Sequence, residues 1–332
     1  MLMIRTLPRL FARTLSTLVI VLVSAFFITR LAYRNPAVML APRNADQQTI
    51  DAVAHALRLD TPWYQQLWYY VYRGPDIQGA PMGLAHWPPA LGYSFRHQAG
   101  VTDLILSKVP VTLSVSLGAL VISAIVSILL GVLAARRADS WIDHTLSGFA
   151  YGALSVPTFL SGMLLSYFLY FQLSMHSINV FPGSGYVALT DDPLQWARHL
   201  LLPWLTLSVA EVGMFQRVVR ASMLNVLGAD YVRTARAKGV PEWRVLLRHA
   251  LPAALNPVIT LGGLELAVIM GGAIVTEQMF GLDGVGRLAI TAALDGDFPV
   301  VIGTTVFAAS VFVGCTLVVD LVTRWRDPAR AV

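Results

Sequence analysis

Residues Val111 to Ala135 read VTLSVSLGALVISAIVSILLGVLAA, a run without a charged side chain. An α-helix needs about 20 apolar residues to cross the hydrocarbon core of a bilayer, so this run is long enough to span a membrane. The whole chain has the same character, with 56% hydrophobic residues, 13% charged residues and a mean hydropathy of +0.62. Soluble domains usually carry about 25% charged residues. The chain is therefore predicted to be a multi-span membrane protein.

Five further apolar runs approach spanning length, which predicts an all-α protein with six transmembrane helices. The predicted spans are 14-33, 109-135, 146-171, 200-220, 255-278 and 298-320. A cleaved signal peptide is the alternative for the first run, because Arg5, Arg9 and Arg13 precede it. No small-x-small cleavage site follows before Arg30, which favours a retained first helix.

The distribution of basic residues predicts the orientation, since Lys and Arg collect near the cytoplasmic ends of spans. Fifteen of the 24 Lys and Arg residues lie in short segments on one predicted side of the membrane: Arg5, Arg9, Arg13, Arg136, Arg137, Arg217, Arg220, Arg233, Arg236, Lys238, Arg244, Arg248, Arg324, Arg326 and Arg330. Most of the others lie in 34-108, a segment long enough to translocate regardless of its charge. Both termini, 1-13 and 321-332, and the 221-254 loop are therefore predicted to be cytoplasmic, with 34-108 external.

Several other functions lack support in the sequence. The net charge of +5 comes from basic residues between apolar runs and not from one continuous face, so no nucleic-acid partner is expected. The sequence contains neither a Gly-x-x-x-x-Gly-Lys phosphate loop nor a cluster of His or Cys residues. No catalytic, cofactor or metal site is therefore expected on this chain. A serine hydrolase built on Ser184 with His176 or His199 is an alternative, but Ser184 lies in a tight Gly-Ser-Gly turn outside the spans. Cys315 is the one cysteine, which excludes an internal disulfide.

The external segment 34-108 shows helix-like spacing over 47–59 and 64–72, followed by a loop rich in Gly and Pro over 74–89. Its aromatic residues gather between Trp63 and Tyr72. Such a run can form a ligand-binding surface, but it more often belongs to a core or to a belt at the membrane interface, and we favour the second interpretation.

The cytoplasmic loop contains the sequence DYVRTARAKG from Asp230 to Gly239. Its composition predicts a short helix over 229–238, and Gly239 stands where a left-handed residue ends a helix. Pro241 can open a second helix over 242–251. Two short helices joined at a glycine predict a compact knob. The residues alone fit two roles equally, a handle for a partner protein and a basic loop resting on anionic lipid.

Two chemical features of the knob suit a protein partner. Small residues at Ala235, Ala237 and Gly239 would let a partner surface approach closely. The basic side chains of Arg233, Arg236 and Lys238 could then pair with its carboxylates.

The loop resembles the EAA loop of ATP-binding-cassette (ABC) importer permeases, in which an Ala, a Gly and a Leu-Pro pair keep a fixed spacing. The matching residues here are Ala235, Gly239, Leu251 and Pro252. Nearly the whole chain is similar to the dipeptide/oligopeptide/nickel branch of these permeases. The matching stretches include Leu59-Asp60-Thr61-Pro62, Leu91-Gly92-Tyr93-Ser94, Pro110-Val111-Thr112-Leu113, Ser155-Val156-Pro157-Thr158-Phe159, Arg248-His249-Ala250 and Asp297-Phe298-Pro299-Val300-Val301.

This resemblance implies the type I ABC importer permease fold and a channel-forming role. It implies an ATPase-coupling loop formed by Asp230, Tyr231, Arg233, Thr234, Ala235, Arg236, Ala237, Lys238, Gly239, Leu251 and Pro252. The implied partners are a second homologous permease, two ATPase subunits that bind ATP and Mg, an external substrate-binding protein and membrane lipid in the bacterial inner membrane. Segment 34-108 is expected to cap the path and dock the binding protein.

The implied cargo is a dipeptide or oligopeptide, moved inward by alternating access. A nickel or other metal complex, or another small solute, is the alternative cargo. The chain departs from the family at Arg58, at Ala90, at 82–89 and at Asp283-Gly284, which affects substrate identity more than fold. A secondary transporter is a further alternative, but the sequence shows none of the inverted repeats or broken helices of that class.

Charged residues within or at the ends of spans are candidates for lining the path, because such groups usually face a bundle interior or a pore. The candidates are Glu211, Glu265 and Glu277. A helix-end ion pair of Glu211 with Arg217 or Arg220 is the alternative for the first. Glu265 lies among glycines that indicate close helix packing, and a carboxylate there could bind the amino terminus of a peptide.

Overall fold

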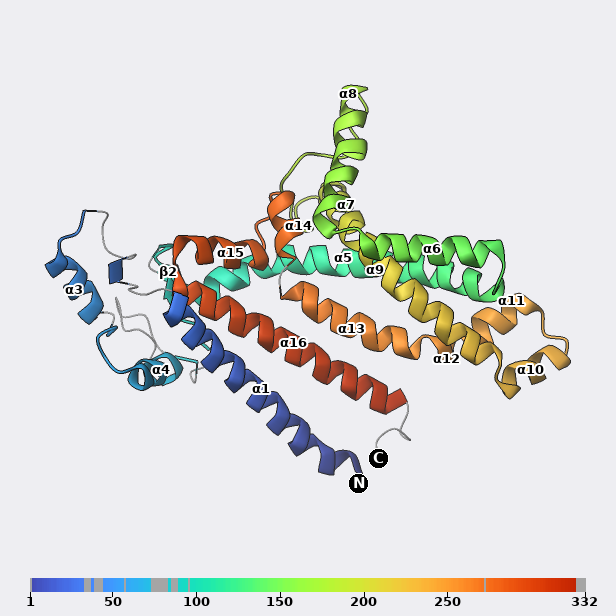
Figure 1. The fold of residues 1–332 in the computed structure, drawn as a ribbon, viewed down its shortest axis with the longest axis horizontal. Helices are drawn as coiled ribbons and strands as arrows, with labels where there is room; N and C mark the ends of the chain where they lie inside the picture. Colours follow the sequence, from blue (N-terminus) through green and yellow to red (C-terminus); the bar gives the residue numbers. More distant parts are fainter. Residues whose placement is uncertain are drawn as a thin grey trace. The chain divides into compact units, whose positions relative to one another are not determined.

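The computed structural model describes residues 2–32, 37–38, 44–56, 58–72, 83–84, 89–94, 96–271 and 273–326, with the backbone alone at 2–11, 32 and 324–326. These residues are mainly helical and include one small antiparallel sheet (Figure 1). They form two compact units. The first combines Met1–Thr112 with Asp283–Gly314, and the second combines Leu113–Leu282 with Cys315–Val332.

The first unit begins with an apolar helix and ends with the two helices near the C-terminus. Its elements are α1 (Leu2–Ala32), α3 (Gln47–Ala56), α4 (Trp63–Tyr72), β1 (Tyr93–Ser94), β2 (Ala99–Gly100), the start of α5 (Val101–Arg136), α15 (Val285–Asp295) and most of α16 (Phe298–Arg326). Buried Val101 and Ile105 of α5 pack with Leu288 of α15 and Val300 of α16. Gly303 allows this contact, because a Cβ there would lie 2.4 Å from Val101.

The aromatic run of the external segment serves packing at two of its residues. Tyr70 is buried with Phe26 and Ile302, and its hydroxyl donates to the carbonyl oxygen of Leu91 at 3.0 Å. The ring of Trp63 lies 5.0 Å from that of Phe27 on α1. These contacts support the packing interpretation. Most of the Gly- and Pro-rich stretch over 74–89 lies outside the described residues.

The β1–β2 hairpin is joined to the α15–α16 turn by polar contacts. Ser94 donates a hydrogen bond to the buried carboxylate of Asp297, and Arg96 pairs with Asp295 at 3.1 Å. Gly296 between the two acids adopts φ +73°, a left-handed conformation that favours glycine at a helix end. The hairpin is therefore fixed to a turn nearly 200 residues away in sequence.

The second unit contains the remaining helices. They are the rest of α5, α6 (Trp141–Ser155), α7 (Thr158–Leu165), η1 (Ser166–Gln172), α8 (Leu173–Met175), α9 (Pro193–Leu227), α10 (Asp230–Ala237), α11 (Glu242–Arg244), η2 (Val245–Ala250), α12 (Leu251–Ala254), α13 (Asn256–Met270), α14 (Ile274–Met279) and the end of α16. Helix α9 packs against α6, α7 and α13. Asp192 caps its start by accepting from the N–H groups of Leu194 and Gln195, and Pro193 occupies the first turn.

Four of the described helices are long and apolar enough to cross a membrane: Ala12–Leu31, Val101–Arg136, Thr158–Met175 and Phe298–Thr323. The pair Glu242–Ala254 and Asn256–Met270, bent by 51°, would make a fifth. The sequence predicted another span at 200-220. That segment lies within α9 and carries Thr206, Ser208, Glu211 and Gln216, which make it less apolar. The count of six therefore stays a prediction.

Two predicted spans are interrupted. The run predicted over 146-171 is divided at Val156 and Pro157, because proline lacks an N–H and disfavours helical backbone in the residue before it. The run over 255-278 is divided between Met270 and Ile274. Sequence inspection found no broken helices, and that expectation was wrong. Breaks of this kind occur where irregular backbone is covered by protein or lines a cavity.

Candidate coupling site

The loop after α9 contains a short helix with a well-defined glycine end. Figure 1 shows α10 and α11 next to the end of α9. The N–H of Gly239 donates to the carbonyl of Arg236 at 2.9 Å, and that of Val240 donates to Ala235 at 3.2 Å. Gly239 has φ +75°. These features form a Schellman motif, which confirms the predicted helix end at this glycine.

The inner face of α10 holds the loop together. Val232 and Ala235 on α10 are buried against Val245, with Val240 packed beside them. The sequence predicted that Ala235 lies on the surface offered to a partner. Its side chain instead belongs to the loop's own core, because the glycine turn folds η2 back under α10. A small residue is needed there for internal packing.

Arg236 is also used within the loop. Its Nε and Nη2 donate to the two carboxylate oxygens of Glu242 at 3.1 and 2.8 Å, and Nη1 donates to the carbonyl of Leu227 at 3.4 Å. The hydrogen bonds and charge of Arg236 lower the pKa of Glu242, and Glu242 raises that of Arg236. Arg236 therefore clamps the two sides of the glycine turn, which makes it less available to a partner than the sequence suggested.

The outer face of the loop is open. Arg233 and Lys238 are exposed beside Ala237 and Gly239, and Tyr231 is 50% exposed on the same helix. A Cβ at Gly239 would have no atom within 4 Å. Arg233 forms a loose pair with Asp230 at 3.7 Å, and no carboxylate of the described residues pairs with Lys238. This face offers two cations and an unobstructed turn to another molecule.

The loop is anchored to the membrane helices by its second half. Leu246 and Ala250 of η2 pack against Phe215 and Val219 of α9. The predicted helix over 242–251 is instead one turn of α-helix followed by a turn of π-helix. Pro252 accounts for part of this change, because it cannot donate the α-helical hydrogen bond to the carbonyl four residues earlier. The Leu251-Pro252 pair thus helps to set the direction in which the chain passes from the loop to α13.

The first candidate path residue lies between α5 and α9. Glu211 is 6% exposed and accepts a 2.5 Å hydrogen bond from the hydroxyl of Ser123. The helix-end pair with Arg217 or Arg220 is not formed, since Arg220 binds Asp143 and Arg217 stacks on Tyr151. Ser116, Ser123 and Ser127 of α5 are all buried, at spacings of seven and four residues that place them on one face of the helix. That serine spacing was the missed signal.

The other two candidates lie on the broken span. Glu265 is half-buried on α13 and is close enough to Glu211 to interact with it electrostatically. Glu277 is fully buried on α14. Gly263 shows the close packing expected near Glu265, because a Cβ there would lie 2.1 Å from Val319. A role in lining the path remains a prediction for all three glutamates.

One strong interaction was not predicted from the sequence. Arg220 Nε and Nη2 each donate to Asp143 at 2.5 Å, which joins the start of α6 to α9. Asp143 also accepts from Asp139 N at 3.0 Å, and these contacts lower its pKa to about 2, chiefly through Arg220. The Ser140-x-x-Asp143 spacing, which is typical of a helix start, was the available signal.

The hydrolase alternative gains no support from the described residues. Ser184 packs beside Gly281, and no hydrogen bond joins it to His176 or His199 there. The ring of His199 bonds the carbonyl of Gln195 at 2.8 Å. Among these same residues no group of three or more His, Cys, Asp or Glu side chains could hold a metal.

Comparison with known families identifies the class of protein to which these apolar helices and this basic loop belong. Residues 127–332 match the family described as binding-protein-dependent transport system inner membrane component, and residues 3–116 match its N-terminal family. The chain belongs to this family of multi-pass membrane transport proteins.

Several curated relatives align along almost their whole length. A Brucella abortus (strain 2308) protein provisionally named a peptide transport system permease is 36% identical over 319 residues, covering 96% of each chain. A probable D,D-dipeptide transport system permease of Escherichia coli (strain K12) is 33% identical, covering 93% of this chain and 92% of its own. The glutathione transport system permease of Escherichia coli O6:H1 is 34% identical, covering 94% of both.

A solved structure described as an amino acid ABC transporter with histidines is 16% identical. It covers 68% of this chain and 94% of its own, with a TM-score of 0.45. That likeness is too distant to add to the argument.

Proposed function

We propose that this chain is a channel-forming subunit of an ATP-driven peptide importer in the bacterial inner membrane, with both termini cytoplasmic. It pairs with a second, homologous permease and receives peptides from an external binding protein. It binds no ATP itself, and two separate ATPase subunits drive it between outward-open and inward-open states. The family membership and the named functions of the relatives support this proposal.

The observation that carries the coupling role is the glycine turn at the end of α10. The turn is built by internal contacts, yet a Cβ added at Gly239 would meet no atom within 4 Å. The backbone of Gly239, at φ +75°, favours glycine, and the open space around its Cβ position leaves room for another molecule to approach the turn closely. We therefore assign Gly239, Ala237 and Lys238 to the surface that an ATPase subunit contacts.

Replacing Gly239 with Asp tests this assignment. The side chain adds bulk and negative charge at the outer face, and the left-handed backbone favours glycine. We expect co-purification of the ATPase subunits and peptide uptake to fall at least tenfold, corresponding to roughly 1.4 kcal/mol or more. Insertion and pairing with the sister permease should not change, since neither uses this turn.

Gly185 provides a matched control. It also has a positive φ, +124°, and open space around its Cβ position, but it lies in a loop predicted to be external. Gly185→Asp therefore strains the backbone at least as much without touching the coupling surface. Normal ATPase recovery and uptake in Gly239→Asp, or an equal loss in both variants, would exclude the assignment.

Two further measurements test the remaining parts of the proposal. Cysteines at Asp192 and at Gly239, placed in a Cys315→Ser background, should differ in intact cells: only the first should react with an impermeant maleimide. Uptake of labelled dipeptides and pentapeptides by the reconstituted complex tests the cargo. Uptake of nickel chelates without peptide uptake would replace the peptide assignment by the metal alternative.

A further inference from the structure

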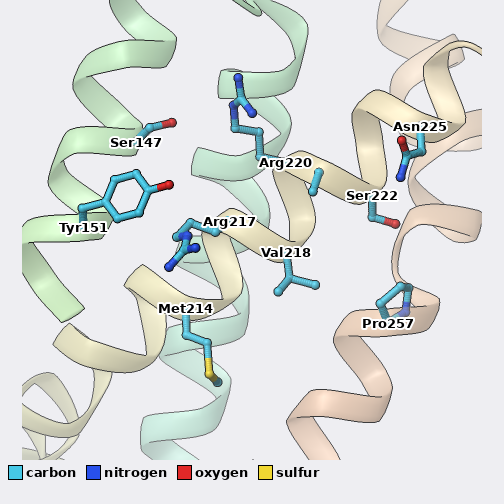
Figure 2. Close-up of a pocket in the computed structure, with 10 residues that line it drawn as sticks. Ser147, Tyr151, Met214, Arg217, Val218, Arg220, Ser222, Asn225 and Pro257 are labelled. Atoms are coloured by element: carbon cyan, nitrogen blue, oxygen red, sulfur yellow. The ribbon is translucent and has the colours of Figure 1, made fainter.

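A cavity of about 640 Å³ lies in the second unit, where α6, α9 and the start of α13 meet. Figure 2 shows Ser147 and Tyr151 of α6 on one side, Pro257 of α13 on the other side, and Arg217 of α9 between them. This volume is in the usual range for small-molecule sites. By the predicted orientation, the cavity lies at the cytoplasmic ends of the helices.

The two arginines of the cavity have different partners. Arg220 is held by Asp143 through two hydrogen bonds, so its charge is matched within the chain. Arg217 stacks its guanidinium 4.5 Å from the ring centroid of Tyr151, and no carboxylate of the described residues pairs with it. The cavity therefore has a net charge of about +1, supplied by a guanidinium that an aromatic ring positions without neutralising it.

The remaining lining has a polar and an apolar part. Ser222 and Asn225 face the cavity from the last turns of α9, and neither side chain bonds another described residue. Met214, Val218 and Pro257 supply an apolar wall (Figure 2). The cavity is thus suited to a small amphipathic anion, with one negative group at Arg217 and uncharged apolar and amide groups beyond it.

The cavity shares its main wall with the coupling loop. Phe215, Val219 and Met223 of α9 pack against η2 on one face of the helix. Met214 and Val218, which line the cavity, pack against the same cluster of buried residues. A ligand in the cavity would therefore contact the helix that carries the coupling loop.

We propose that this cavity binds the carboxylate end of a cargo peptide at the cytoplasmic side, with Arg217 as the anion-binding residue and Tyr151 as its positioning residue. This inference rests on the proposed function and adds a recognition site on the permease itself. A dipeptide or tripeptide offers a carboxylate for Arg217 together with amide groups and small side chains, provided that its ammonium terminus extends away from Arg217.

The test uses the whole reconstituted complex with a reporter cysteine at Ala221, an exposed residue of the cavity wall, in a Cys315→Ser background. Maleimide labelling is measured in phosphatidylcholine nanodiscs with increasing Ala-Ala or its C-terminal amide. We expect Ala-Ala to slow labelling several-fold, with a half-protecting concentration about tenfold or more below that of the amide, because a charged hydrogen bond is lost in the amide.

Three variants assign the effect to its residues. Arg217→Gln should abolish the difference between acid and amide, and Arg217→Lys should keep part of it, because the charge remains but the planar fork is lost. Tyr151→Phe should retain most of it, since the ring remains. Arg137→Gln removes an exposed arginine outside the cavity and should change nothing. A reporter cysteine at Ala138, in the α5–α6 turn, should label equally with and without peptide.

Each outcome decides between the two proposals. Uptake of labelled Ala-Ala without protection of the cysteine, or equal protection by acid and amide, overturns the site and leaves the proposed function. Protection that depends on Arg217 without any uptake keeps the site and removes peptide import. Protection by phosphatidylglycerol in the nanodisc, with no effect of Ala-Ala, would identify the cavity as a lipid headgroup site and overturn the inference.

Discussion

Two arginine–carboxylate pairs in the second unit use the same bidentate chemistry in different surroundings. The Asp143–Arg220 pair joins α6 to α9, and its side chains are 3% and 27% exposed. The Arg236–Glu242 pair clamps the glycine turn of the coupling loop, and its side chains are 39% and 43% exposed. The buried pair has N–O distances of 2.5 Å, against 2.8 and 3.1 Å in the exposed pair.

We expect burial, and not the type of pair, to set how much each interaction contributes to stability. Asp143 accepts from Asp139 N and Ser147 Oγ in addition to Arg220, so its removal would leave several donors unpaired. Water can replace either partner in the exposed pair, and such pairs contribute about 0–1 kcal/mol. We expect the first pair to fix the helices and the second to define local geometry.

The largest effect is expected from breaking the buried pair. Asp143→Asn removes the charge and leaves Arg220 without its carboxylate, which should lower the free energy of unfolding by roughly 3 kcal/mol. Thermal unfolding of the purified complex in detergent measures the change. The conservative Asp230→Asn, at a residue almost fully exposed, is the control and should leave the melting temperature near that of the wild type. A melting temperature of Asp143→Asn equal to that of this control would contradict the ranking.

Acid should weaken the same pair in a defined pH window. The pKa of Asp143 is lowered from an ordinary 3.8 to about 2, so its stabilisation is fully present above about pH 4 and is lost as the pH falls toward 2. A loss of roughly 2 kcal/mol is expected across that window. The measurement compares the melting temperature of wild type and Asp143→Asn between pH 5 and 2. The gap between them should narrow on acidification, and a constant gap would show that Asp143 is not held by its charge.

Replacing both partners sharpens the comparison. Asp143→Leu with Arg220→Met removes the buried charges together and substitutes apolar groups. Exchanging a buried pair for packed apolar residues is often neutral, so we expect a cost of about 1 kcal/mol or less. A double variant as unstable as Asp143→Asn alone would mean that the hydrogen bonds to Asp139 and Ser147 matter more than the pairing of charges.

The smallest effect is expected at the exposed pair. Glu242→Gln should change the free energy of unfolding by less than about 1 kcal/mol, because solvent screens both groups. Its effect should also disappear at high salt, which that of Asp143→Asn should not. A loss of stability as large as that of Asp143→Asn would refute the link between burial and strength. Coupling to the ATPase can be measured on the same variant, and a loss there without destabilisation would show that the clamp serves the shape of the turn.

Local signals predicted the elements whose causes lie within a few residues. A helix often ends at a left-handed residue, which glycine adopts readily, so Gly239 predicted the end of α10. The structure confirms this helix end. The apolar run over 109-135 likewise lies within a single long helix, α5. The breaks at Pro157 and between Met270 and Ile274 were missed, because apolar composition continues through both and hides the change of direction.

The roles of single side chains in the candidate site were predicted less well. Ala235 and Arg236 match the family's spacing, and the sequence placed both at a partner surface. Their actual contacts depend on how η2 folds back under α10, which a linear pattern does not encode. The sequence suggested an ion pair between Glu211 and one of two arginines on the same helix. In the structure, Glu211 instead accepts a hydrogen bond from a serine of another helix.

The sequence by itself determined that this chain is a helical membrane permease with a basic loop whose first helix ends at Gly239. Those properties depend on hydropathy, on the side on which cations collect and on the conformational freedom of one glycine, all of which are local. Only the tertiary structure decided that Asp143 holds Arg220 while Arg217 stays unpaired over Tyr151. The distance between charges on different helices is set by packing. The sequence alone would therefore also have allowed other pairings of these charged residues.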